Sequence, residues 1–131
     1  MNTNKHTYRG IVIPADVTKD CYEQTFSHYT ELQKTIGGNF DVVAMSTPDG
    51  IPFDIWCDDE GLLKQLDLNV TVLMLVNELT GHVPTIVGDV VVTGGADAQG
   101  RSLDIEPKIE AAIYAMRGRE RAHRNNHPST T

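Results

Sequence analysis

Four carboxylates stand close together in the middle of the chain: Asp54, Asp58, Asp59 and Glu60. Hard divalent cations prefer several carboxylate oxygens, so this acid cluster is a candidate cation site. The EF-hand loop needs acids at alternate positions, a glycine at the sixth and a glutamate at the twelfth, and the cluster lacks that spacing. The simpler interpretation is that the acids cap a short helical turn at 62–66, where the positive helix end favours carboxylates. We therefore expect no metal site and no cofactor.

Trp56 lies inside the same acidic stretch. Residues 51–57 alternate like a half-buried strand, which puts Trp56 on one face with Asp54 and puts Phe53 and Ile55 on the other. A tryptophan on a face shared with acids is a candidate anchor for a partner protein. It fits equally well beneath a helix on the second face of a sheet, and the sequence leaves both interpretations open.

Nucleophiles and glycine-rich loops give no catalytic pattern. The chain has no nucleophile elbow, Walker loop, dinucleotide fingerprint or Cys-His zinc array. Cys57 alternates onto the apolar strand face, and with Cys21 it is expected to be a free thiol. Asp89 follows Gly88 between two β-branched runs, and we interpret this pair as a structural turn rather than a catalytic or metal carboxylate. We predict no catalytic residues and a protein that is not an enzyme.

Charge is divided unevenly along the chain, whose net charge is −7. Residues 1–106 carry −10 and residues 107–131 carry +3. An acidic body repels phosphate, so direct nucleic-acid binding is disfavoured. The basic end is a candidate contact for an acidic partner, through Arg117, Arg119, Arg121 and Arg124.

The pattern of strands and helices that would position these residues predicts one α+β domain. We expect a leader at 1–7, a domain at 8–124 and a flexible tail at 125–131. The predicted mixed sheet has about five strands, at 8–13, 39–46, 51–57, 70–76 and 88–93. Two main helices are expected at 27–36 and 106–122, the first with Ser27 as a plausible N-cap. The predicted core is Ile11, Ile13, Leu32, Ile36, Val42, Phe53, Ile55, Leu73, Leu75, Val90, Val92 and Ile113.

Five segments, in order, resemble a small family known only as a domain of unknown function, found in bacteriophages, mobile elements, actinobacteria and firmicutes. The segments are 13–16, 32–43, 59–63, 66–69 and 86–94, and the family-like part spans about 11–95. The chain departs from the family pattern at Val70, where a basic residue is usual. The resemblance implies a small intracellular accessory protein, plausibly phage-encoded, and no particular activity.

These observations favour a non-enzymatic protein that binds a host or phage protein, plausibly to counteract host defence. The lack of a long apolar run or a signal peptide predicts a cytoplasmic protein without a membrane segment. A homodimer is left open. Two alternatives also stay open: an acidic DNA mimic that inhibits a nuclease or restriction enzyme, and a protein that sequesters a small molecule or nucleotide.

Overall fold

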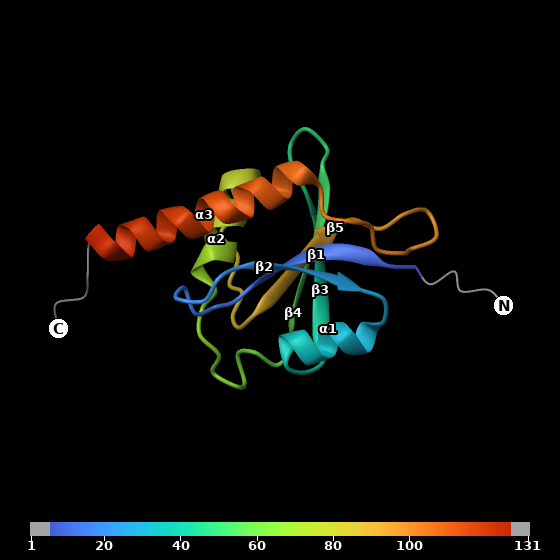
Figure 1. Cartoon of the computed structure of the whole chain (residues 1–131), viewed down its shortest axis with the longest axis horizontal. Coiled ribbons are helices and arrows are strands. Elements are labelled where there is room, and N and C mark those ends of the chain that lie inside the picture. The colour runs from blue at the N-terminus through green and yellow to red at the C-terminus, as the bar shows by residue number, and fades with distance from the viewer. Residues whose placement is uncertain (1–5, 127–131) are drawn as a thin grey trace.

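A computed structural model describes residues 6–126, which form one five-stranded sheet with helices on both faces (Figure 1). The order of elements along the chain is β1 (Tyr8–Ile13), β2 (Tyr22–Phe26), α1 (Tyr29–Ile36), β3 (Phe40–Ser46), β4 (Pro52–Asp58), α2 (Val70–Thr80), β5 (Val90–Gly94) and α3 (Pro107–Asn126). Strands and helices share one domain, as the α+β prediction requires.

The strand order across the sheet is β2-β1-β5-β4-β3. Each of the four neighbouring pairs is antiparallel, so the expectation of a mixed sheet is wrong. The last strand in sequence, β5, takes the central place between β1 and β4, which leaves β2 and β3 at the two edges.

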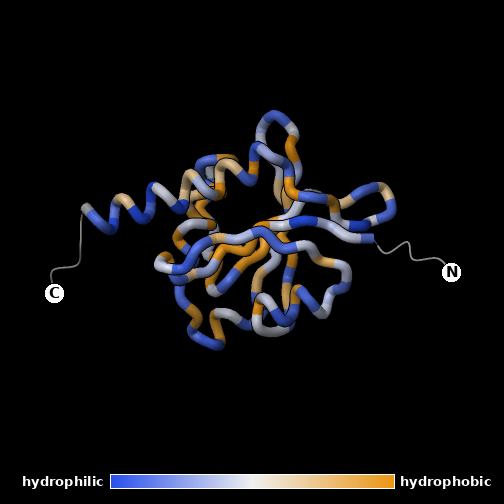
Figure 2. Tube along the Cα trace, in the orientation of Figure 1, coloured by the Kyte–Doolittle hydropathy of each residue, from blue (hydrophilic) through white to orange (hydrophobic). Residues whose placement is uncertain are grey.

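The first face of the sheet is covered by α2 and α3. Alternate residues of the three inner strands, such as Ile11, Ile55 and Val92, point to this face and are fully buried. They pack against apolar residues of the two helices, including Leu75 and Ile113. Figure 2 shows the apolar residues concentrated on the strands and on the stretches of helix that face them. This face therefore holds the larger hydrophobic core.

The second face is covered by α1 alone. Leu32 and Ile36 of this helix pack on Val12, Val91 and other residues of the second face. The N-cap of this helix is His28, whose side chain accepts a hydrogen bond from the Thr30 amide. The Glu31 side chain accepts a hydrogen bond from the His28 amide. This capping box moves the start one residue beyond the predicted cap.

Two segments differ from the sequence prediction. The apolar run at 70–76 is helix, because buried Asn69 caps it by accepting from the Val72 amide and because its buried residues follow helical spacing. Residues 22–26, where no strand was predicted, form edge strand β2. Of the predicted core, Leu73 is only half-buried and Val42 is exposed, since the first lies on a helix and the second on an edge strand.

The remaining boundaries shift by small amounts. Residues 62–66 form turns rather than a helix, with Gln65 at φ 58°. Helix α3 continues to Asn126, through the start of the predicted tail. Residues 1–5 of the leader and 127–131 of the tail lie outside the described residues.

Candidate binding edge of the sheet

Strand β3 is a long and exposed sheet edge. Six of its seven side chains are apolar or small and uncharged, and the exception is Asp41 near its start. The exposed fractions of Val42 and Val43 are 47% and 36%, which is high for β-branched residues in a strand. Edge strands of this length and polarity present a template for pairing with another chain unless a charge, proline or bulge blocks them. None of these interrupts the strand between residues 42 and 46.

The backbone groups that face outward from β3 follow from its register with β4. Backbone hydrogen bonds from the Thr47 amide to the Ile51 carbonyl and from the Asp59 amide to the Asn39 carbonyl flank the paired segment. Hydrogen-bonded and non-hydrogen-bonded pairs alternate in an antiparallel ladder, so the odd-numbered residues of β3 bond to β4. The even-numbered residues, Val42 and Ala44 among them, direct their N–H and C=O groups to the open edge.

The opposite edge, β2, is less suited to pairing. It is five residues long, and its middle is the polar sequence Glu23, Gln24 and Thr25. Glu23 lies 3.4 Å from the guanidinium of Arg9 on the neighbouring strand. Short length and charge are the usual means by which proteins protect an edge. Of the two edges, β3 is therefore the candidate binding site.

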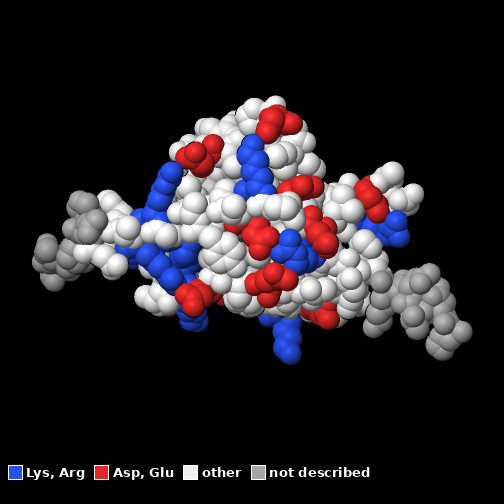
Figure 3. Space-filling model, turned by 45° about the horizontal axis from the view of Figure 1, so that its top comes forward, with Lys and Arg blue, Asp and Glu red and all other residues white. Residues whose placement is uncertain are grey.

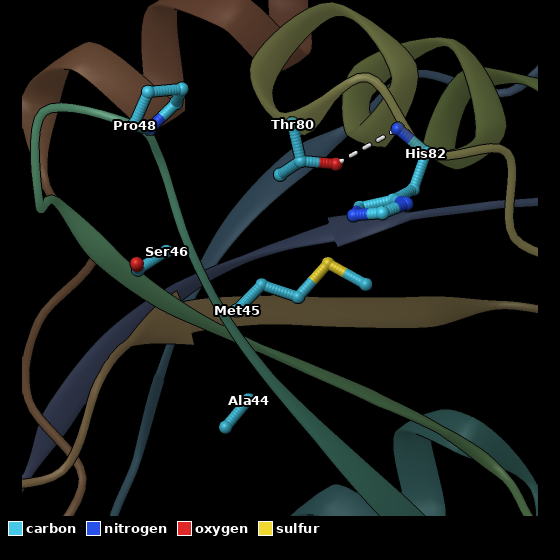
Figure 4. Close-up of a pocket in the computed structure, with 6 residues that line it drawn as sticks. All are labelled: Ala44, Met45, Ser46, Pro48, Thr80 and His82. Carbon is cyan, nitrogen blue, oxygen red and sulfur yellow. Dashed lines mark hydrogen bonds between the residues drawn. The ribbon is translucent and has the colours of Figure 1, made fainter.

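A cavity of about 390 Å³ lies between β3 and the end of α2. In Figure 4 the Met45 side chain points from the strand toward the ring of His82, and Thr80 lies beside them. The Thr80 hydroxyl accepts a hydrogen bond from the His82 amide at 3.2 Å, which fixes the turn after the helix. Ser46 and Pro48 line the cavity from the strand end and the hairpin turn. The cavity gives a side-chain pocket next to the open backbone edge.

A second cavity of about 390 Å³ lies at the other end of the strand. Asp41 and Cys57 line it from the sheet, and Leu62, Leu63 and Val87 line it from the connections around α2. The exposed fractions of Leu62 and Leu63 are 70% and 83%. Two adjacent leucines in solvent are unusual beside a free sheet edge and add apolar surface to it.

The acid cluster is separated by the fold. Asp58 is buried and lies 2.7 Å from the ammonium of Lys64. Burial opposes ionisation of Asp58, but the Lys64 ion pair and the Glu60 amide lower its pKa below the ordinary value. Asp59 and Glu60 are exposed. Within residues 6–126, no group of three or more acidic, histidine or cysteine side chains is placed to hold a metal ion.

Asp54 lies apart from the other acids, on the second face of the sheet. Its exposed fraction is 8%, and its cross-strand neighbours are Ala44 on β3 and Thr93 on β5. It makes no hydrogen bond or ion pair within the described chain. Burial raises the pKa of its carboxyl. Its position is too enclosed for an exposed partner contact.

Trp56 is half-buried on the same face. Its indole Nε1 donates to the Thr93 hydroxyl at 2.9 Å, and its ring meets Phe40 edge-on at a centroid distance of 5.3 Å. It packs with the cluster that includes Leu32 and Ile36 of α1. Of the two interpretations that the sequence left open, the structure therefore places Trp56 beneath a helix rather than in solvent.

The arginines of α3 mostly bind within the chain. Arg117 is buried and donates to the backbone carbonyls of Pro14, Asp16 and Lys19. Arg121 donates to the carbonyls of Val17 and Lys19 and pairs with Asp20. Arg119 faces Glu78 at 3.6 Å, and Arg124 faces Glu120 at 3.2 Å. These contacts hold the 14–20 connection against the helix, and the predicted basic patch is largely neutralised.

The turn at Gly88 and Asp89 is a backbone feature. Gly88 has φ +80°, and its carbonyl accepts a hydrogen bond from the side-chain Nδ2 of Asn69. Asp89 accepts from the backbone amide of Ala15 at 3.0 Å, so it joins two connections rather than bonding within its own turn.

Both signs of charge are interspersed on the face drawn in Figure 3. Within the described chain several opposite charges are paired, for example Arg9 with Glu110 at 2.9 Å and Lys108 with Asp49 at 3.0 Å. A mimic of the DNA backbone needs a continuous row of negative charge, which this face does not present.

Sequence reasoning missed the residues that line the β3 edge. Met45, His82, Leu62 and Leu63 carry no motif, and Val42 was assigned to the core. The apolar residues of 39–46 predicted a strand, but only the strand order shows that the strand has no outer neighbour.

Comparison with known proteins gives one family. A domain of unknown function, DUF3846, matches residues 8–117. No curated protein and no solved structure matches the chain. None of the helices in the described part of the chain has the length and apolar character that a membrane crossing requires.

Proposed function

The chain belongs to the DUF3846 family, a domain of unknown function, and we propose that it is a non-enzymatic binding protein whose β3 edge takes an extended segment of a partner protein as a sixth strand. The partner is a host or phage protein in the cytoplasm, and the chain acts as an accessory factor, as the resemblance to phage-encoded proteins suggests. Binding by strand addition uses main-chain hydrogen bonds for affinity and side-chain pockets for specificity.

The open edge of β3 is the observation that carries this proposal. Val42 and Ala44 direct their backbone groups outward, and the strand is exposed along residues 41–44. A cavity flanks each end of the strand. An edge and two pockets on one side of it are the parts that strand addition uses. The interspersed charge on the face drawn in Figure 3 gives the DNA-mimic alternative less support, and no observation singles out a small-molecule ligand.

Ala44→Pro tests the role of the edge. Proline removes the outward N–H of this residue, while the bonds of Val43 and Met45 to β4 remain, so the fold should be kept. Ala44→Thr is the matched control, because it keeps the N–H in a residue that favours strands. Both variants should unfold in urea within about 1 kcal/mol of the wild type, the usual effect of an exposed substitution.

The assay is selection from a displayed library of random linear peptides, followed by affinity measurement with synthetic copies. We expect peptides that bind the wild type and the Ala44→Thr variant equally and that lose at least about tenfold affinity for Ala44→Pro, since a peptide carbonyl opposite residue 44 is left without its donor. Amides of Val42 and Ala44 should gain protection from hydrogen exchange on binding. Selected peptides that bind Ala44→Pro as well as the wild type would contradict the proposal, as would a selection without binders.

A further inference from the structure

We infer that the partner segment runs antiparallel to β3 and carries the pattern apolar-x-apolar-x-Lys/Arg, with its basic residue at the Asp41 end. This inference rests on the proposed function and specifies the chemistry of the partner. Three observations carry it: the order of side chains on one face of β3, the cavity beside Met45 at one end of that face, and the exposed acids Asp41 and Asp59 at the other end.

Asp41, Val43 and Met45 lie in a row on the face of β3 that looks toward α2. The register puts them beside Cys57, Ile55 and Phe53 of β4, which belong to the face covered by α2 and α3. Side chains of a sixth strand opposite this row would point to the same face. Alternate residues of the partner therefore meet an acid, a valine and a methionine in turn.

The Met45 end accepts an apolar side chain. Met45 is partly buried against the main core, and its thioether side chain faces the cavity that His82 and Thr80 close. Val83, which follows His82 in the sequence, is 66% exposed and adds an apolar side chain to the surface after α2. Methionine adapts to side chains of different shape, so this pocket selects for size and apolarity rather than for one residue type.

The Asp41 end of this face is acidic. Asp41 and Asp59 line the second cavity, are exposed and make no ion pair within the described residues. Lys64 is held by buried Asp58 at 2.7 Å and interacts more weakly with Asp59. Two exposed carboxylates with so little compensation attract a Lys or Arg side chain. The exposed Leu62 and Leu63 can pack on the methylene stem of such a side chain.

Antiparallel pairing sets the direction of the pattern. All described strand pairs of the sheet are antiparallel, and this pairing is the more stable per residue. An antiparallel segment meets Met45 first and Asp41 last, which puts its basic residue toward its C-terminus. A second copy of the chain cannot supply this pattern through its own β3, since FDVVAMS contains no basic residue. A partner of different sequence fits the charge, and the β3 edge of a second copy does not.

The test uses four synthetic peptides that share serine and glycine flanks and a fluorescent label. The cores are Leu-Thr-Val-Thr-Lys, its reverse Lys-Thr-Val-Thr-Leu, the acidic Leu-Thr-Val-Thr-Glu and the truncated Ser-Thr-Val-Thr-Lys. Fluorescence anisotropy measures binding to the wild type, to Asp41→Asn and to Ala44→Pro, at low and high salt.

The first peptide should bind the wild type about 5-fold tighter than the reversed and acidic peptides at low salt, and high salt should reduce this preference. The Asp41→Asn variant should lose about 2- to 5-fold of that preference. The truncated peptide should bind about tenfold weaker, because it buries no leucine side chain at the Met45 cavity.

Equal affinity for all four peptides, with loss on Ala44→Pro, would overturn the inference and leave the proposed function standing. Tighter binding of the reversed peptide would overturn the antiparallel direction. A dimer in sedimentation that Ala44→Pro dissociates would show that a second copy occupies the edge, and would overturn the inferred partner. Binding that ignores Ala44→Pro would count against the proposed function itself.

Discussion

Substitution of Gly88 by alanine has two energetic costs, the positive φ and a steric contact, and each can be measured separately. Its φ of +80° lies in the left-handed region, and a Cβ at this position would stand 2.7 Å from Cδ1 of Leu66. Gly81 is a natural control, since its φ is +82° and nothing lies within 4 Å of its Cβ position. Alanine at the two sites therefore carries the same backbone cost, with a steric contact at only one of them.

The expected magnitudes follow from this geometry. Left-handed backbone costs a non-glycine residue about 1–2 kcal/mol, which is the expected loss for Gly81→Ala. Leu66 is half-buried, and its Cδ1 is the far end of a flexible side chain, so moving it away should cost a further ~1 kcal/mol, the low end of the cost of overpacking. Gly88→Ala should therefore lose about 2–3 kcal/mol of unfolding free energy. At roughly 4 °C for each kcal/mol in a domain of this size, its melting temperature should lie about 4 °C below that of Gly81→Ala.

Urea unfolding followed by tryptophan fluorescence is the direct assay, because Trp56 is the only tryptophan and packs in the second-face cluster. An unchanged dependence on urea concentration would show that the mutants share one unfolded state. In a Leu66→Ala background the excess cost of Gly88→Ala should vanish, because the Cδ1 atom is gone. If Gly88→Ala is as costly there as in the wild type, Leu66 is not the source of the excess and the steric argument fails.

Two further substitutions test buried polar groups. Asn69 caps α2 and donates to the carbonyls of Ile13 and Gly88, so Asn69→Ala should lose about 2–4 kcal/mol in urea unfolding, and a loss under 1 kcal/mol would contradict this role. Burial raises the folded-state pKa of Asp54, so the ionised carboxylate destabilises the folded state. This destabilisation is absent below the unfolded-state pKa and grows as the pH rises through the folded-state pKa. Asp54→Asn should therefore raise the melting temperature at pH 7 but not near pH 3, and a lower melting temperature at pH 7 would refute this.

The sequence was sufficient where the pattern of a segment matches its burial. Apolar and β-branched runs predicted β1, β3, β4 and β5 to within about two residues. Pro107 marked the start of α3. These patterns act over neighbouring residues, and their physical cause is the side-chain period of each element. A local signal, a glycine between two β-branched runs, also predicted the turn at Gly88.

One element was misassigned and one was missed, because burial in the fold differs from what the local pattern suggests. Val70–Val76 is largely apolar, as a central strand would be, but α2 packs against α3 and in the core on the first face of the sheet, and Asn69 caps it as a helix. Strand β2 is polar because it lies at an edge with four of its residues outside the core, so its sequence resembles a connection.

The candidate site depended on tertiary structure alone. Hydrophobic period shows which side chains of β3 share a face, but the identity of the neighbouring strand depends on contacts between residues far apart in the chain. The placement of β5 in the centre leaves β3 at the edge and exposes Val42, which an inner position would have buried. The same arrangement puts Leu62 and His82 beside the strand, and separates the consecutive acids because one turn buries Asp58 on Lys64 while Asp59 faces solvent.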